Sequence, residues 1–317
     1  MSRRLPYRLL QAALVLLIMS LVIYGLMGLM PGDPVDVMIA TNPKLTPADA
    51  ERLRALYGLD QPLARRYLNW LAMAARGDLG FSRLAGRPVV EVMAQPLGNT
   101  ALLMSLSLLA ALLVALPIGV AAALRPDSLL DRTVNLLAFA GISMPVFWLG
   151  LMLIAGFAVV LGVLPAGGVH SVGGGGTADR LRHLALPVAT LAVASIGQYV
   201  RHMRAAMIET LRNDYVRTAR AKGAGWARVV IHHALRNALI PVVTIVALDF
   251  GALFSGALIT ETVFAYPGMG RLIFDSIMGN DFNMALAALL LATLLTLLGN
   301  LLADAAYAWL DPRIGDR

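Results

Sequence analysis

The sequence predicts an all-α membrane protein with six transmembrane helices. Hydrophobic residues make up 58% of the 317 positions and charged residues only 14%, and the mean hydropathy is +0.73. This composition leaves too little polar surface to cover a soluble domain of that length. Six uncharged runs follow one another along the chain, without the alternating pattern of barrel strands. Because irregular backbone cannot face lipid, we expect these runs to be α-helices.

Most of the runs are long enough to cross a bilayer. A helix rises about 1.5 Å per residue, so roughly 20 residues span a hydrocarbon core of about 30 Å. The fourth run is shorter and is expected to continue as helix into the cytoplasm, with Arg201 and Arg204 reaching towards the headgroups. Pro117, Pro145 and Pro241 each predict a kink or a helix start. The runs are 9–30, 97–124, 133–164, 184–200, 238–248 continued by 250–260, and 284–303.

The orientation follows from the Lys and Arg residues in the short connections. Three precede the first run, two separate the second from the third, eight lie in the 201–236 loop and two in the tail. The opposite short loops hold only Arg180, Arg182 and Arg271. By the positive-inside rule, both termini and the 201–236 loop are expected to be cytoplasmic. The first run is too long for a signal-peptide core, so we interpret it as a retained anchor.

This topology divides the chain into five parts. They are an N-terminal anchor helix (1–30), an external, periplasmic helical loop (31–96), a transmembrane core (97–310) with a cytoplasmic loop at 209–238, and a cytoplasmic tail (311–317).

The external loop carries two helix signals. Thr46, Pro47 and Asp49 supply an N-cap, a proline at the first helical position and a capping acid. A second helix with an apolar stripe follows Pro62 and is expected to end at Gly77. These helices form a platform for an external partner or lie on the membrane surface; the sequence favours neither alternative.

The basic loop over 214–239 predicts a helix, a tight turn and a second helix. Good helix formers run up to Gly223, Ala224 and Gly225, and a helical pattern resumes at Trp226. Small residues at the turn let a partner approach the backbone closely, and the basic flanks orient that partner. On charge alone, a solvated basic loop held at anionic headgroups is the more frequent case.

The loop and several further stretches resemble the dipeptide and oligopeptide branch of ATP-binding-cassette importer permeases. In the EAA motif of such permeases, an acidic residue, two small residues and a glycine correspond here to Arg217, Thr218, Ala219 and Gly223. Arg217 in place of the glutamate and Arg236 near the usual proline are typical of the peptide branch. The stretches are DYVRTARAKG and HALRNALIP in the loop, PGDPV at 31–35, GLDQPL at 58–63, GDLG at 77–80, ETVFAYPGMGRL at 261–272 and LDPR at 310–313.

The resemblance implies a type I importer permease fold and a division of labour between subunits. Such a permease forms a heterodimer with a second homologous permease, sits on two cytoplasmic ATPases and receives substrate from an extracytoplasmic binding protein. Dipeptides or short oligopeptides are the expected substrates, with nickel chelates, glutathione or another small solute as alternatives. The implied ATPase-coupling residues are Arg217, Thr218, Ala219, Lys222, Gly223, Ala224 and Gly225.

The chain is expected to be a transport subunit and not an enzyme. It contains no GxxxxGK[ST] phosphate loop, so ATP and Mg are expected on the partner ATPases and no cofactor on this chain. The Gly-rich stretch 167–176 has no lysine or helix start after it and is interpreted as a flexible connection.

Asp249 is a translocation-pathway candidate because it lies roughly 15 Å into the fifth run. A charge exposed to lipid there costs at least about 2.5 kcal/mol. We expect Asp249 to face a wet pathway and attract the amino terminus of a peptide, or to pair with a neighbouring helix. Glu261 and Asp304 lie near span ends and are expected to snorkel or pair there. The other pathway candidates and possible partners are Asn135, Ser143 and Gln198.

Other functions lack their sequence signatures. The basic residues behind the net charge of +7 lie between apolar runs without a nucleic-acid motif, which indicates membrane lipid and not nucleic acid. The chain has no cysteine, and its two adjacent histidines, His232 and His233, point about 100° apart on a helix, so no metal site is expected. No HExxH or GxSxG motif supports a membrane enzyme. An ion-coupled secondary transporter stays a less favoured alternative, because Asp249 is its one candidate coupling charge at mid-depth.

Overall fold

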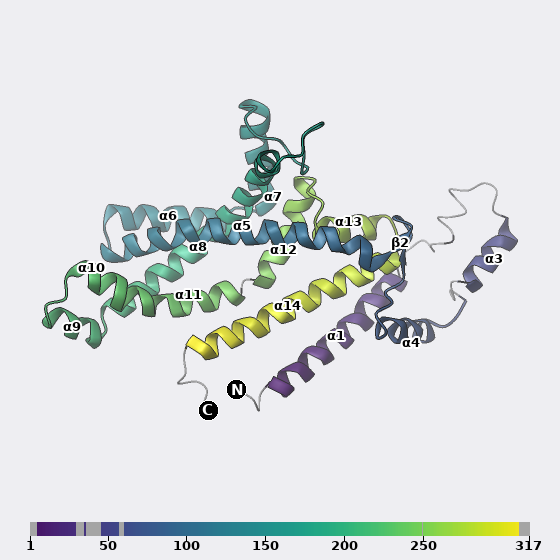
Figure 1. Ribbon diagram of the computed structural model, residues 1–317, viewed down its shortest axis with the longest axis horizontal. Coiled ribbons are helices and arrows are strands. Elements are labelled where there is room, and N and C mark those ends of the chain that lie inside the picture. Colours follow the sequence, from purple (N-terminus) through teal and green to yellow (C-terminus); the bar gives the residue numbers. More distant parts are fainter. Residues whose placement is uncertain (1–4, 30–34, 36–45, 57–59, 249, 311–317) are drawn as a thin grey trace. The chain divides into compact units, whose positions relative to one another are not determined.

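The computed structural model describes residues 5–29, 35, 46–56, 60–248 and 250–310, and most of them are helical (Figure 1). The chain forms two compact units. The larger unit comprises Met1, Asn99–Gly270 and Thr296–Arg317, and the smaller unit comprises Ser2–Gly98 and Arg271–Leu295.

The larger unit contains the following elements whole: α6 (Leu129–Ser143), α7 (Val146–Leu153), the π-helix η1 (Ile154–Val160), α8 (Thr177–Leu211), α9 (Asp214–Ala221), α10 (Trp226–Arg228), the π-helix η2 (Val229–Leu235), α11 (Arg236–Leu248) and α12 (Phe250–Val263). The smaller unit contains α1 (Leu5–Gly28), α3 (Pro47–Leu56), α4 (Leu63–Ala74), β1 (Phe81–Ser82) and β2 (Arg87–Pro88). Three helices belong to both units: α5 (Val89–Leu124), α13 (Met269–Met278) and α14 (Phe282–Leu310).

The two helices predicted in the 31–96 loop are confirmed as α3 and α4. Thr46 and Asp49 form the expected reciprocal cap, because the Thr46 N–H donates to the Asp49 carboxylate at 3.0 Å and the Asp49 N–H donates to the Thr46 hydroxyl at 3.3 Å. The hydrogen bond from the Thr46 hydroxyl holds the pKa of Asp49 below its usual range. α4 ends at Ala74, and the chain turns at Gly77 with a φ of +85°.

The apolar stripe of α4 packs inside the smaller unit. Tyr67 stands edge-on to Tyr24 of α1, with ring centroids 5.5 Å apart, and its hydroxyl is 2.8 Å from the Ser20 hydroxyl. Tyr24 also contacts the rings of Trp70 and Phe282. Four aromatic rings from α1, α4 and α14 therefore form the core of this unit, which fixes α4 to the anchor helix.

The third predicted run, 133–164, is divided at Pro145, the position for which the sequence predicts a kink or a helix start. α6 ends at Ser143, and the following helical segment is bent from it by 101°. The cause is Pro145, which has no N–H to donate to α6 and holds Met144 in an extended conformation with a ψ of 124°. Pro145 is the N-cap of α7, so the helix start predicted there is confirmed.

Within the described residues, five helices are long and apolar enough to cross a membrane, and the bent pair raises this number to six if it counts as one span. The fourth run does continue past Arg201, since α8 extends to Leu211. The fifth run is divided into α11 and α12, and Asp249 between them lies outside the described residues. The candidate spans are Pro6–Gly28, Val89–Leu124, Thr177–Leu211, Trp226–Ala247 and Phe282–Leu301, with Leu129–Ser143 and Val146–Val160 as the bent pair.

α8 is the helix on which the larger unit is assembled. It packs against α6, α7, α11 and α12. Glycines permit the closest approaches: a Cβ at Gly197 would overlap the Ala138 carbonyl of α6, and a Cβ at Gly119 of α5 would lie 2.8 Å from the Met203 Cβ. Small residues at such contacts are typical of helices that associate in a membrane.

Alanine substitutions at Gly98 and Gly197 test this packing. Both glycines lie inside helices, but a Cβ at Gly98 would meet no atom within 4 Å. We expect Gly98→Ala to stabilise the protein by about 0.5–1 kcal/mol through helix propensity. Gly197→Ala should destabilise it by roughly 1–3 kcal/mol through overlap with backbone. Thermal unfolding in detergent measures both, and a stabilised Gly197→Ala protein would contradict the close contact of α6 and α8.

Candidate functional site

The segment 209–238 forms the predicted helix, tight turn and helix. α9 ends at Ala221, and the chain reverses at Gly223, whose φ is +84°. The turn is closed by two backbone hydrogen bonds, from Gly223 N to Arg220 O at 2.9 Å and from Ala224 N to Ala219 O at 3.1 Å. α10 then begins at Trp226 and continues through η2 into α11.

This segment presents a basic surface that includes the exposed side chain of Trp226. Trp226 is 46% exposed, and the Arg220 guanidinium lies 4.3 Å from its ring centroid. Ala219 and Ala224 are half-buried, while the other predicted coupling residues are exposed: Arg217, Thr218, Lys222, Gly223 and Gly225. The remaining exposed Arg side chains of the segment are Arg212, Arg220, Arg228 and Arg236. Exposed Trp and Arg are the residues enriched where proteins bind one another.

The inner face of the segment is firmly attached to the larger unit. Val216 is 2% exposed, and α9 packs against η2. The amide of Asn237 in α11 donates a hydrogen bond to the Tyr215 hydroxyl of α9 at 3.0 Å. Below this contact, one core cluster combines α5, α8, η2 and α11: Ala123, Met203, Ala206, Met207, Val230, Ala234, Ala238 and Val242. The segment is therefore a folded projection of the unit.

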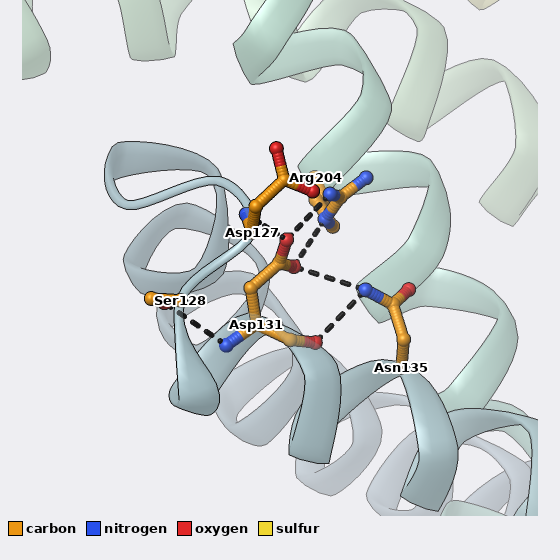
Figure 2. A network of polar contacts seen from close by, with 5 residues as sticks. All are labelled: Asp127, Ser128, Asp131, Asn135 and Arg204. Atoms are coloured by element: carbon orange, nitrogen blue, oxygen red, sulfur yellow. Dashed lines mark hydrogen bonds and ion pairs between the residues drawn. The ribbon is translucent and has the colours of Figure 1, made fainter.

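A buried carboxylate joins α6 to α8 next to that core (Figure 2). Asp131 accepts hydrogen bonds from Arg204 Nε at 2.5 Å and Nη2 at 2.6 Å, and its side chain is only 3% exposed. Asn135 Nδ2 donates to the same carboxylate and to the Asp131 carbonyl, each at 2.9 Å. The Asp127 N–H also donates to the carboxylate, and Ser128 caps α6 by accepting from the Asp131 N–H.

This ion pair was not foreseen in the sequence. Arg204 was expected to reach towards headgroups, and that expectation is wrong because the side chain is held by Asp131. Its neighbour Arg201 lies over the Phe139 ring at 4.5 Å. The available signal was Asp131 itself, an acid directly at the start of an apolar run and three residues after a capping serine.

The described pathway candidates lie on α6 and α8. Asn135 has its amide bound to Asp131, Ser143 is exposed at the end of α6, and Gln198 is half-buried on α8. Asp249 and the side chain of Asp304 lie outside the described residues. A pathway role for these residues stays a prediction. In the described part of the chain, no group of three His, Asp or Glu residues could hold a metal ion.

A second buried carboxylate organises the stretch after α12. Glu261 is fully buried and accepts hydrogen bonds from the Thr100 hydroxyl at 2.5 Å and from the Gly270 N–H at 2.7 Å. A Cβ at Gly268 would overlap the Glu261 carboxylate. Of the two expectations for this residue, pairing is therefore confirmed. Tyr266 is also fully buried, and burial raises the pKa of its hydroxyl, which donates to the Asn99 carbonyl at 3.2 Å.

Hydrogen bonds hold the first half of the Gly-rich stretch 167–176. Gly168 N–H donates to the Phe264 carbonyl at 2.9 Å, and a Cβ at Gly167 would overlap that carbonyl. In the middle of the stretch, Ser171 donates to the Asp179 carboxylate through its N–H at 2.8 Å and its hydroxyl at 2.6 Å.

These features define a multi-pass α-helical membrane protein that carries a folded basic projection between two of its helices. The chain belongs to the family described as binding-protein-dependent transport system inner membrane component, whose pattern matches residues 115–316. The pattern for the N-terminal part of such membrane components matches residues 1–84.

Several relatives are similar over almost their whole length. The oligopeptide transport system permease protein AppB of Bacillus subtilis is 40% identical, with 95% of each chain covered. The di/tripeptide transport system permease protein DppB of Pseudomonas aeruginosa is 40% identical, with 93% of each chain covered. The dipeptide transport system permease protein DppB of Escherichia coli K12 is 36% identical, again with 93% of each chain covered.

Solved structures share the fold. An inward-facing structure of the MetNI methionine ABC transporter has a TM-score of 0.57 at 19% identity and covers 69% of this chain and 96% of that chain. An amino acid ABC transporter crystallised with histidines has a TM-score of 0.54 at 16% identity and covers 69% of this chain and 94% of that chain. The type I importer permease fold implied by the resemblance is confirmed.

Valine substitutions at Gly223 and Gly225 test the turn. Valine at Gly223 must adopt a positive φ, which costs about 1–2 kcal/mol, whereas Gly225 has a φ of −61° and a ψ of 151°, which valine accepts. Trypsin cleaves after the exposed Arg220 and Lys222. We expect roughly 5- to 30-fold faster cleavage there for Gly223→Val and little change for Gly225→Val. Equal rates in the two variants would contradict the strained turn.

Replacement of Glu261 by glutamine tests the second carboxylate. Glutamine offers one acceptor oxygen where the native side chain offers two, so one buried donor loses its partner. We expect a loss of about 1.5–3 kcal/mol in the free energy of unfolding. Glu209→Gln, at an exposed position of α8, is the control and should stay within about 0.5 kcal/mol of wild type. Similar losses in the two variants would contradict a stabilising role of the Glu261 hydrogen bonds to Thr100 and Gly270.

Proposed function

We propose that this chain is the membrane-spanning permease subunit of an ATP-driven importer of dipeptides and short oligopeptides. It forms half of the translocation pathway and pairs with a second homologous permease as a heterodimer. Two cytoplasmic ATPases bind its 214–237 loop, and an extracytoplasmic binding protein delivers the substrate. The observation that carries the proposal is 36–40% identity to peptide permeases over more than 90% of both chains.

The geometry of the projection supports its role as the ATPase-coupling loop. Its outer surface combines exposed cationic side chains with Trp226, and its inner residues pack on α5 and α8. A partner with an acidic groove is steered by the cations and gains apolar contact from the tryptophan. Because the projection is folded onto the core, a push from the ATPases passes to α8 and α11 as a rigid-body movement.

The division of labour assigns ATP hydrolysis to the partners. This chain has no phosphate-loop motif, so ATP and Mg bind the ATPase subunits and this subunit holds no cofactor of its own. The basic residues of the 201–236 loop support a cytoplasmic position for the projection and for both termini.

Uptake by the reconstituted complex tests the proposal. Vesicles containing this chain, the second permease and both ATPases are supplied with the binding protein and a labelled dipeptide. We expect uptake that requires ATP and persists when a protonophore collapses the proton gradient, because hydrolysis supplies the energy. Uptake driven by an ion gradient without ATP would refute the importer proposal.

The same vesicles test the substrate class. Unlabelled short peptides should compete with the labelled dipeptide, whereas a nickel chelate and glutathione should not. Selective competition by either of these solutes would overturn the peptide assignment and leave the importer class intact.

A further inference from the structure

We infer that Asp131 and Arg204 are positioning residues for energy coupling, because their ion pair makes the α5–α6 turn move together with the 209–238 projection. The inference rests on the proposed function. It adds a second moving part, the turn over residues 125–131, to the coupling apparatus.

The Asp131 carboxylate connects the turn over residues 125–131 to α8, and we call this connection the joint. On one side it binds the α8 guanidinium through two parallel hydrogen bonds, the arrangement that fixes orientation as well as distance. On the other side it accepts from the Asp127 N–H at 2.9 Å. Asp127 has a φ of +61°, a conformation that costs energy in a residue other than glycine and needs support from its surroundings. The same carboxylate thus stabilises the turn and attaches it to α8 (Figure 2).

The α8 side of the joint is continuous with the projection. Met203, Ala206 and Met207, which flank Arg204 in sequence, are buried against η2 and α11. α8 ends at Leu211 and α9 begins at Asp214, so only a short link separates the joint from the projection. Ala123, near the end of α5, belongs to the same core. A movement of the projection therefore reaches α5 by packing, and it reaches α6 by packing and through the ion pair, which holds the start of α6 and the turn before it.

The ion pair of Asp131 and Arg204 adds a constraint that the packing of α6 on α8 does not supply. A close contact of apolar side chains can slide, whereas a two-point Arg–carboxylate contact resists rotation. Removal of the Arg204 charge leaves the buried Asp131 carboxylate without its counter-charge, which is unfavourable. A residue that only stabilised the fold would change how much complex assembles. A positioning residue also changes how much substrate moves per ATP hydrolysed.

The test measures uptake and ATP hydrolysis together in the full complex with its binding protein. The variants are Asp131→Asn and Arg204→Gln, and Arg201→Gln is the matched control. Arg201 is a cation on the same helix that also contacts α6, through the Phe139 ring and without an ion pair. We expect uptake per ATP to fall by about fivefold or more in both test variants. The control should keep the wild-type ratio.

A cysteine pair provides a second test of the inference if the single variants assemble poorly. The chain has no cysteine, so Asp131→Cys combined with Arg204→Cys can be joined selectively by a short bifunctional thiol reagent. Uptake per ATP should be low in the unlinked double variant and should rise after linkage.

Two results would overturn the inference: a wild-type ratio in the assembled single variants, or the same ratio in the double variant before and after linkage. Absence of ATP-dependent uptake in the wild-type complex would instead refute the proposed function, so the two failures are distinguishable.

Discussion

A buried carboxylate needs partners within the protein, and this constraint determines the shape of the chain at two places in the larger unit. Asp131 binds α8 and supports a turn in which Asp127 has a φ of +61°. Glu261 binds Thr100 of α5 and the Gly270 N–H at the start of α13, on the far side of the turn that follows α12. In both cases the hydrogen bonds to one acidic side chain offset the desolvation of its charge. At Asp131 they also stabilise a backbone conformation that non-glycine residues rarely adopt. Each carboxylate is therefore a clamp on a turn between helices.

The two clamps lie near opposite ends of one stretch of α5. Thr100 contacts the Glu261 clamp directly, and Ala123 lies in the core beside the Asp131 clamp. The two positions are 23 residues apart, which corresponds to about 35 Å of helix, roughly the thickness of the hydrocarbon core. Glycines permit close helix contacts in this region, with Gly119 of α5 against α8 and Gly197 of α8 against α6. Such backbone contacts leave few side chains that can rearrange, which favours movement of these helices as rigid bodies.

Much of the fold could be predicted because it depends on local rules. Apolar length located the spans, the Thr46 and Asp49 pair located α3, and Gly223 located the turn of the projection. Pro145 predicted a kink or a helix start, but hydrophobic periodicity does not give the size of the bend, which is 101°. The ion pair of Asp131 and Arg204 could not be predicted, since its members are 73 residues apart. Each residue also has a common local explanation, a helix start for Asp131 and the membrane surface for Arg204. Contacts of that kind depend on which helix faces meet, and the sequence pattern of one helix does not contain that information.

The outer residues of the projection contribute little to the stability of the fold. Arg217 is 78% exposed, and its contact with Asp214 is 3.4 Å long between two exposed side chains, so it contributes little to stability. The turn and the inner face are instead held by backbone hydrogen bonds, by buried Val216 and by the contact of Asn237 with α9. Substitution of the outer residues is therefore expected to leave the helices beneath undisturbed. Under the proposed function, an arginine in place of the glutamate of the general EAA motif reverses the sign of charge at this position, and complementarity then requires a matching reversal on the ATPase surface.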